Sequence, residues 1–212
     1  MITVILPSYA RDTLNRSLQS LLNQTNPNWV CQLGLDGYTG PQQSSQFLLT
    51  GGRPVPFPII EDPRIKTTYI PQKLGNKYYR QPETGNGQGG LVRNILIDQV
   101  DTEWITFLDD DDTFAVDCIE KCYQEIAEYD FDCSILKRAY DPGYQQLIPP
   151  RGCTELELGK VSTSFLLRTE FIRKNGIVFV NDKFEDYIYS KMIQARGGQI
   201  RFSDHVTYHV EF

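Results

Sequence analysis

The stretch Trp104-Ile-Thr-Phe-Leu-Asp-Asp-Asp-Asp-Thr-Phe114 joins a short apolar run to four consecutive aspartates. Phe107, Leu108 and their apolar neighbours are typical of a buried strand. Asp109 to Asp112 follow with no basic residue among them. At a strand-like rise of about 3.3 Å per residue, such carboxylates repel one another unless a positive charge lies between them. Carboxylate oxygens suit hard divalent cations, so the stretch predicts a Mg²⁺ or Mn²⁺ site.

The same aspartates also fit a solvated acidic turn that caps a helix beginning near Ala115, because Asp is a good helix cap. Position decides between the two interpretations. Open α/β sheets bind ligands at the carboxyl ends of their strands, which is where these aspartates are predicted to lie. The metal site is therefore the preferred interpretation.

Composition limits the class of protein. The 212 residues suffice for one sizeable core, and 40% of them are hydrophobic, as in a soluble globular protein. A net charge of −6 argues against nucleic acid as a partner. Five cysteines without metal-type spacing predict reduced core thiols. No apolar run has the length of a transmembrane segment and no signal-peptide pattern is present, which predicts a cytoplasmic protein and leaves peripheral membrane contact open.

The first residues predict a βαβ unit. Ile2 to Leu6 is a β-branched strand that Pro7-Ser8-Tyr9 ends. Asp12 or Thr13 is placed to cap a helix that carries Leu14, Leu18, Leu21 and Leu22 on one stripe. A second strand, Trp29 to Leu35, stops at Asp36-Gly37.

Residues 38–62 and 73–90 are rich in Gly, Pro and polar residues, and we interpret them as long surface loops. Neither contains the Gly-Lys-Ser/Thr pattern of a phosphate loop. The remaining patterns predict strands near residues 65–70, 133–136, 164–167, 200–202 and 206–210, and helices near 91–99, 115–129, 169–176 and 185–196. The chain is therefore predicted to be one α/β domain, residues 1–212, with a mostly parallel central sheet flanked by helices.

Several motifs occur in an order that resembles a known family. They are Val4-Ile-Leu-Pro-Ser-Tyr9, the strand that ends in Asp36-Gly37, the pair Arg93-Asn94, the turn Leu108-Asp-Asp-Asp-Asp112, and Glu185-Asp186. Together they resemble an inverting family 2 glycosyltransferase of the GT-A (Rossmann-like) fold. The resemblance covers nearly the whole chain and is weakest over residues 38–90 and 140–160. It implies a transferase of hexosyl type that acts in polysaccharide biosynthesis.

The resemblance also implies a binding site for a nucleotide diphosphate sugar, with UDP-sugar as the first guess. Pro7, Ser8 and Tyr9 match positions that hold the nucleobase, and Asp36 matches a carboxylate that contacts base or ribose. Leu35 and Tyr38-Thr-Gly40 depart from the family pattern around that carboxylate. Arg93 matches a nucleotide contact, where its planar fork suits phosphate or base. Alternatively, Tyr9 packs at a strand end, Asp36 is a turn residue and Arg93 is a surface arginine.

Within the acidic run, the family's Asp-x-Asp fits Asp109 and Asp111, and Asp110 is left to face the ribose. Asp111 is the strongest candidate ligand for Mn²⁺ or Mg²⁺ bridged to the diphosphate. A histidine near the end of the chain often completes such a site, for which His209 is the better candidate and His205 the other. A lone histidine is more often a packed or solvated residue.

The chemistry of glycosyl transfer requires a base for the acceptor hydroxyl and stabilisation of the leaving diphosphate. By the resemblance, Asp186 is the base and Glu185 positions the acceptor, which is a carbohydrate, a lipid-linked group or a protein. The opposing interpretation is that both acids only complement the positive end of a helix dipole. Three alternative functions stay open: a non-catalytic nucleotide-sugar-binding module, a nucleotidyltransferase on a related fold, and a retaining transferase.

Overall fold

The structure is a computed structural model that describes residues 1–40, 53–75, 89–140 and 146–210. Its strands, in chain order, are β1 (Ile2–Ser8), β2 (Trp29–Asp36), β3 (Tyr38–Gly40), β4 (Arg53–Pro54), β5 (Ile65–Ile70), β6 (Trp104–Phe107), β7 (Thr113–Phe114), β8 (Cys133–Tyr140), β9 (Leu147–Ile148), β10 (Phe165–Arg168) and β11 (Ile200–Val210). Its helices are α1 (Leu14–Leu22), α3 (Gly90–Asp98), α4 (Cys118–Glu128), α5 (Thr169–Lys174) and α6 (Glu185–Ala195).

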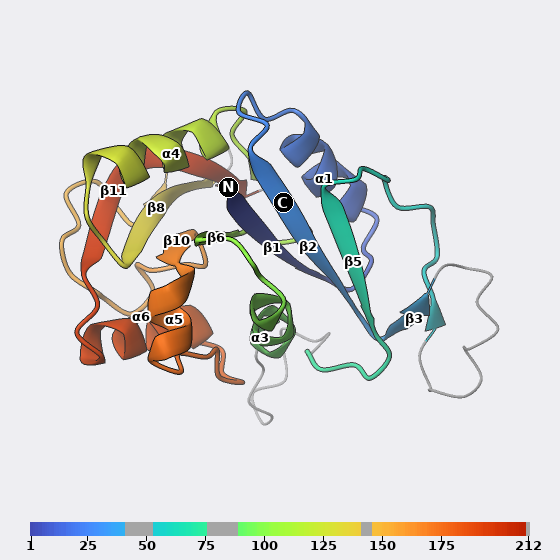
Figure 1. Cartoon of the computed structure of the whole chain (residues 1–212). Helices are drawn as coiled ribbons and strands as arrows, with labels where there is room; N and C mark the ends of the chain where they lie inside the picture. Colours follow the sequence, from blue (N-terminus) through green and yellow to red (C-terminus); the bar gives the residue numbers. More distant parts are fainter. Residues whose placement is uncertain (41–52, 76–88, 141–145, 211–212) are drawn as a thin grey trace.

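The larger sheet has the strand order β5-β2-β1-β6-β10-β8-β11-β7 (Figure 1). The first four strands run parallel to one another. β10 lies antiparallel between β6 and β8, and β11 is again parallel to β8. All seven residues of β1 are buried, as its continuous β-branched sequence predicts for a central strand covered on both faces. The prediction of an α/β fold with a mostly parallel sheet flanked by helices is confirmed.

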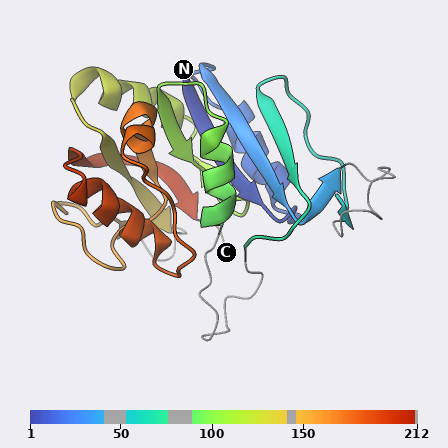
Figure 2. The ribbon, with the colours of Figure 1, turned by 60° about the horizontal axis from the view of Figure 1, so that its bottom comes forward.

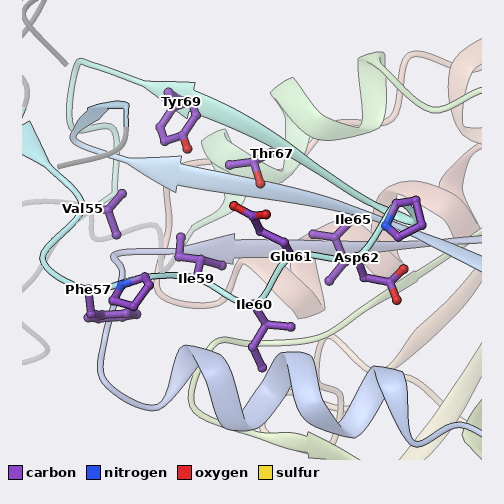
Figure 3. A pocket seen from close by; sticks show the side chains of 11 residues that line it. Val55, Phe57, Ile59, Ile60, Glu61, Asp62, Ile65, Thr67 and Tyr69 are labelled. Carbon is purple, nitrogen blue, oxygen red and sulfur yellow. The ribbon is translucent and has the colours of Figure 1, made fainter. Parts of the chain in front are cut away.

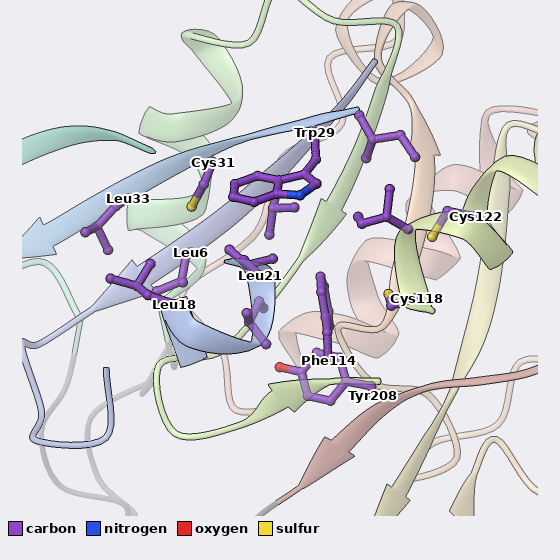
Figure 4. Close-up of a cluster of buried hydrophobic side chains, with 14 of the residues drawn as sticks. Leu6, Leu18, Leu21, Trp29, Cys31, Leu33, Phe114, Cys118, Cys122 and Tyr208 are labelled. Carbon is purple, nitrogen blue, oxygen red and sulfur yellow. The ribbon is translucent and has the colours of Figure 1, made fainter. Parts of the chain in front are cut away.

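Two hydrophobic clusters lie on opposite faces of this sheet. On one face, Leu18 and Leu21 of α1 pack with Cys118 and Cys122 of α4 (Figure 4). On the other face, the core contains residues from α3, α5 and α6. In Figure 2, α3 lies in front of the sheet and α1 behind it. Side chains of a strand alternate between faces, so Val4 and Leu6 of β1 join the first cluster and Ile5 the second.

Gly34 of β2 allows α3 to lie close to the sheet. A Cβ atom at this position would come within 2.9 Å of Cγ1 of Val92 and 3.0 Å of Cδ1 of Leu96. Val92 and Leu96 are almost completely buried by this approach. Full burial of such side chains stabilises the fold by roughly 1.5–3 kcal/mol each. The glycine therefore fixes the position of α3, which carries Arg93 at its first turn.

Some local predictions differ from the structure. Residues 200–210 form one long strand with two register shifts instead of two short strands. Residues 38–62 contain β3 and β4, which pair in a small separate sheet, and residues 41–52 lie outside the described part. Most of the Gly-rich stretch 73–90 is also outside it. Thr13 precedes α1 without a capping side-chain bond, because its hydroxyl donates to the main-chain oxygen of Asp110 instead, at 2.7 Å.

The cysteine prediction is confirmed, since all five thiols are free and four of them are buried. Among the described residues, no helix has both the length and the apolar character needed to cross a membrane.

The parallel strands end at one edge of the sheet. Ser8 pairs with Leu35 at the ends of β1 and β2, and β6 ends just before the aspartate turn. Residues from these three loops therefore meet at that edge.

Candidate active site at the carboxyl ends of the strands

A cavity of about 350 Å³ lies at this edge of the sheet. It is lined by Pro7, Ser8, Tyr9, Arg11, Asp36, Gly89, Val92, Arg93, Asp109, Asp110, Asp111, Asp112, Arg138, Tyr140, Thr163, Glu185, Asp186 and Val210. All the predicted site residues except the two candidate histidines, His205 and His209, are in this set. A larger cavity, of about 830 Å³, lies between residues 55–63 and β5 and contains none of them (Figure 3). The smaller cavity is therefore the candidate active site.

The charge of Asp109 is compensated by two buried arginines. Arg93 donates from Nη2 to Oδ1 at 2.7 Å, and Arg138 donates from Nη2 to Oδ2 at 3.1 Å. Burial acts to raise the pKa of Asp109, but the charges of the two guanidinium groups outweigh it and hold the pKa well below its usual range. The side chain of Tyr208 accepts a hydrogen bond from the Asp109 main-chain nitrogen at 2.6 Å. Asp109 is thus a fixed, ionised centre of the site.

Arginines also lie beside the other end of the acidic run. Nη1 of Arg138 is 3.7 Å from Oδ2 of Asp112, and Arg11 forms an ion pair with Asp111. The sequence indicated that these carboxylates need a positive charge nearby, and a divalent cation was the preferred source. In the structure, Arg11, Arg93 and Arg138 supply positive charge from elsewhere in the chain. Their contribution depends on contacts between residues far apart in the sequence.

Asp110 organises the turn that follows β1. Its Oδ2 accepts hydrogen bonds from the Ser8 hydroxyl at 2.7 Å and from the Tyr9 main-chain nitrogen at 3.1 Å. The Ser8 hydroxyl in turn accepts from the main-chain nitrogen of Ala10 at 2.8 Å. Ala10 has a φ of +50°, a left-handed conformation that costs a residue with a Cβ roughly 1–2 kcal/mol. These bonds hold the turn and direct Arg11 toward Asp111.

Asp36 and Tyr9 lie together at the predicted nucleoside end of the cavity. The carboxylate of Asp36 accepts hydrogen bonds from the main-chain nitrogens of Leu74 and Gly75, both at 2.8 Å. Burial raises the pKa of Asp36, and the two main-chain donors oppose that shift. A Cβ atom on Gly75 would clash with the ring of Tyr9, and Nζ of Lys73 lies 5.5 Å from the ring centre. Asp36 and Tyr9 therefore both contact the segment 73–75.

Arg93 and Glu185 form a buried ion pair, with Nη1 of Arg93 2.5 Å from Oε1 of Glu185. Oε2 of Glu185 accepts a hydrogen bond from the main-chain nitrogen of Gly90 at 3.1 Å. Both side chains are only 3% exposed. The guanidinium of Arg93 bridges Glu185 and Asp109. The sequence interpretation had predicted that Arg93 contacts the nucleotide. Glu185 connects α6 to α3 through these bonds. The sequence interpretation had predicted that Glu185 positions the acceptor.

Asp186 is half-buried in the first turn of α6 and lines the cavity. Burial raises the pKa of Asp186 to about 6, while Arg93 and Arg138 lower it and Asp109 raises it. Burial also raises the pKa of Glu185 to about 7, against the effect of Arg93. The helix dipole alone would lower the pKa of Asp186 and so make it a poorer base. Burial raises that pKa by more. A carboxylate with such a pKa is a competent base at neutral pH.

The predicted metal ligands are not gathered around one point. Among the described residues, no group of three or more His, Cys, Asp and Glu side chains is placed to hold a metal ion. Tyr208 contacts Asp109, so its neighbour His209 points to the other face of β11 and is exposed. Nε2 of His205 lies 3.6 Å from Oε1 of the buried Glu125, away from the cavity. Asp111 has the most exposed side chain of the four aspartates, at 42%.

Sequence reasoning missed Arg11, Arg138 and Thr163. The hydroxyl of Thr163 accepts a hydrogen bond from Nη2 of Arg138 at 3.1 Å, and its main chain bonds to Asp186. A signal for Arg138 was present, because Lys137 and Arg138 interrupt an otherwise apolar strand, β8. Charged residues are rarely buried unless they are paired, so such an interruption indicates a buried ion pair.

A family model described as "Glycosyl transferase family 2" matches residues 62–188, more than half of the chain. The match begins after Tyr9 and Asp36 and ends before His209. No curated protein sequence matches the chain.

Several solved structures share the fold. The structure of S. aureus TarS 1-349 has a TM-score of 0.67 at 18% identity, and the match covers 99% of this chain and 60% of that one. The same protein in complex with UDP-GlcNAc has a TM-score of 0.65 at 17% identity, covering 98% and 57%. The mannosyltransferase PcManGT from Pyrobaculum calidifontis, in complex with GDP-Man and Mn²⁺, has a TM-score of 0.59 at 11% identity, covering 97% and 55%. The chain thus spans about 60% of the length of the TarS structure.

Proposed function

Because the chain belongs to glycosyl transferase family 2, we propose that it transfers a sugar from a nucleotide diphosphate sugar to an acceptor hydroxyl, with inversion at the anomeric carbon. One observation carries this proposal. The aspartate turn and Asp186 line the same cavity, although Asp186 lies 74 positions after Asp112 in the sequence. A site for the leaving diphosphate and a base for the acceptor are therefore available side by side.

The donor's nucleoside is assigned to the end of the cavity formed by Pro7, Ser8, Tyr9 and Asp36. Tyr9 offers an aromatic face for a base, and Asp36 offers a buried carboxylate that accepts hydrogen bonds from N–H groups. The nucleoside must then compete with Leu74 and Gly75 for Asp36. Uridine is our first choice, and the binding of UDP and UDP-GlcNAc by TarS supports it.

The chain offers a divalent cation one accessible carboxylate, and the donor would complete the site. Mg²⁺ is usually bound by one or two carboxylates together with substrate phosphates. Asp111 has an accessible carboxylate on the cavity, whereas Asp109 is already bonded to two guanidinium groups. Asp111 would therefore hold Mn²⁺ or Mg²⁺ with diphosphate oxygens as further ligands, and the Mn²⁺ in the PcManGT complex supports this choice. When bound, the ion would neutralise charge on the leaving diphosphate.

Asp186 is the proposed general base. Its ionised carboxylate accepts the proton of the acceptor hydroxyl as the acceptor oxygen bonds to the anomeric carbon and the bond to the diphosphate oxygen breaks. Attack from the side opposite to the leaving group inverts the configuration. Arg93 and Arg138 keep Asp186 ionised against the effect of its burial. Glu185, paired with Arg93 and bonded to Gly90, holds the start of α6 and so orients its neighbour.

The test combines a binding screen with a turnover assay. Nucleotide diphosphates and nucleotide sugars, each with Mn²⁺ or with a chelator, are screened by the shift in melting temperature, since a ligand of the native state raises apparent stability. Donors that bind are then assayed for release of the nucleotide diphosphate, and the anomeric configuration of the product is read by NMR. Binding without hydrolysis or transfer would indicate a binding module, a retained configuration a retaining enzyme, and release of inorganic diphosphate a nucleotidyltransferase.

A further inference from the structure

The ion pair between Arg11 and Asp111 differs from the other charge pairs of the aspartate turn. Its two side chains are 43% and 42% exposed. The arginines that hold Asp109 are 3% and 10% exposed. Arg11 and Asp111 both line the candidate active site. A ligand that enters the cavity can therefore contact this pair without breaking the buried ion pairs of Asp109.

The main chain of Arg11 is held in place, whereas its paired guanidinium group is accessible to solvent. The turn of residues 8–10 is fixed by Asp110, as described above, and Nε of Arg11 lies 3.6 Å from Oδ1 of Asp110. An arginine side chain has several rotatable bonds, and its planar fork binds phosphate as readily as carboxylate. Arg11 can therefore change partners while its main chain stays in place.

We infer that Arg11 is an exchangeable counter-ion of Asp111, which it leaves for a phosphate oxygen when a nucleotide diphosphate and a divalent cation bind. The inference rests on the proposed function. Before binding, each charge neutralises the other. After binding, Asp111 is paired with the cation and Arg11 with the diphosphate, so no charge is left without a partner.

The exchange makes the two ligands respond in opposite ways to loss of Arg11. A cation that binds alone must displace Arg11 from Asp111, so Arg11→Gln is expected to strengthen binding of the cation alone. A nucleotide diphosphate that binds alone can pair its phosphate oxygens with Arg11. Arg11→Gln is therefore expected to weaken binding of the nucleotide diphosphate alone. A purely structural role for Arg11 would predict weaker binding of both ligands.

Arg16 provides a matched control. Its Nη2 donates to the main-chain oxygen of Asp111 at 2.7 Å, so it brings a positive charge to the same residue through the main chain. If only the general electrostatic field mattered, Arg16→Gln would change both affinities as Arg11→Gln does. If the carboxylate pair matters, Arg16→Gln changes them little.

The experiment uses the full chain and two separate titrations. Mn²⁺ binding without nucleotide is followed by the electron paramagnetic resonance of free Mn²⁺, and UDP binding in excess chelator by calorimetry. For Arg11→Gln we expect Mn²⁺ affinity to rise and UDP affinity to fall, each by roughly five- to tenfold, the lower range of measured couplings between ligands. Asp111→Asn should abolish Mn²⁺ binding, and the addition of Arg11→Gln to that variant should not restore it. Melting temperatures close to wild type show that the variants fold.

The outcomes separate this inference from the proposed function. Weaker binding of both ligands, unchanged binding of both, or equal effects of Arg16→Gln would each overturn the exchange while leaving the transferase proposal intact. Absence of Mn²⁺ binding in both the wild type and Arg11→Gln would also overturn the exchange alone. Failure of the wild type to bind UDP in the presence of Mn²⁺ would overturn both.

Discussion

Two adjacent acids, Glu185 and Asp186, have different environments. Glu185 is buried and bonded to Arg93 and Gly90, whereas Asp186 is half-buried and lines the cavity. A catalytic base must reach the proton that it removes. Accessibility therefore supports our proposal of Asp186, and not Glu185, as the base, although the residues are neighbours in the sequence.

Replacement of this base gives the first prediction. Asp186→Asn keeps the size of the side chain and removes its basicity, so transfer should fall by roughly a hundredfold or more while nucleotide binding is retained. In the wild type, the rate should rise with pH to a plateau, with a midpoint near the pKa of about 6, because only the ionised carboxylate accepts a proton. Initial rates from pH 4.5 to 8 check this. Wild-type rates in the variant would remove Asp186 from the mechanism.

Asp36 gives a second prediction at this scale. Asp36→Ala should weaken binding of the nucleoside alone and of its diphosphate by a similar factor, about tenfold, the scale of a hydrogen bond to a charged group. Calorimetry with uridine and UDP measures both. Asp62→Ala is the control, since Asp62 is bonded to Arg64 and lies outside the cavity. If uridine binds equally well to wild type and Asp36→Ala, Asp36 serves only to hold Leu74 and Gly75.

At the scale of elements, the start of α6 is attached to α3 by paired contacts. Asn94 of α3 donates to the main-chain oxygen of Phe179 at 2.9 Å and accepts from its nitrogen at 2.8 Å. Gly90 of the same helix bonds to Glu185, and a Cβ atom there would lie 2.8 Å from Cβ of Phe179. The position of Asp186 therefore depends on α3, a helix that begins 96 residues before it.

A third prediction tests this attachment. Asn94→Ala leaves both main-chain groups of Phe179 without this partner, so the free energy of unfolding should fall by about 1–3 kcal/mol. The transfer rate should fall with it, because Asp186 moves. The control is Asn175→Ala, which removes one bond, to the Phe171 carbonyl of α5, far from the cavity. Denaturant melts and rates are compared. A loss of stability without a loss of rate would show that α6 is positioned by other contacts.

For the whole molecule, buried acids link folding to pH. The pKa values of Glu185 and Asp186 are raised by burial, so the folded state binds their protons more tightly than the unfolded chain does. Stability from these groups is therefore greatest at low pH and decreases as the pH rises to about 7. Asp109 acts in the opposite sense, because its lowered pKa contributes stability that is lost in acid.

The fourth prediction follows from these signs. Between pH 5 and 7.5, the free energy of unfolding of the wild type should decrease by more than that of Asp186→Asn, with a difference on the order of 1–2 kcal/mol. Chemical denaturation at each pH measures it. Equal slopes in the two proteins would show that Asp186 has the same proton affinity folded and unfolded.

The sequence by itself determined the local features of this protein. Apolar runs placed β1, β2 and β6, because a strand buried on both faces requires continuous apolar residues. The β-branched residues of Ile65 to Ile70 placed β5, which lies at the edge of the sheet. The order of short motifs indicated the family, and the strand ends indicated where a cavity lies. The aspartate turn and Asp186, which line that cavity, could be picked out because each motif is contiguous in the chain.

Only the tertiary structure decided how the charges are shared. The sequence shows four aspartates without a basic neighbour, yet Arg11, Arg93 and Arg138 come from a turn, a helix and a strand to pair with them. Long-range ion pairs leave no periodic pattern in a sequence, since they depend on which loops meet at the sheet edge. The same reason explains why Glu185 and Asp186 differ, and why His209, suggested by its position in the chain, points away from the cavity. Burial and partners, which are set by packing, determine what each charged side chain does.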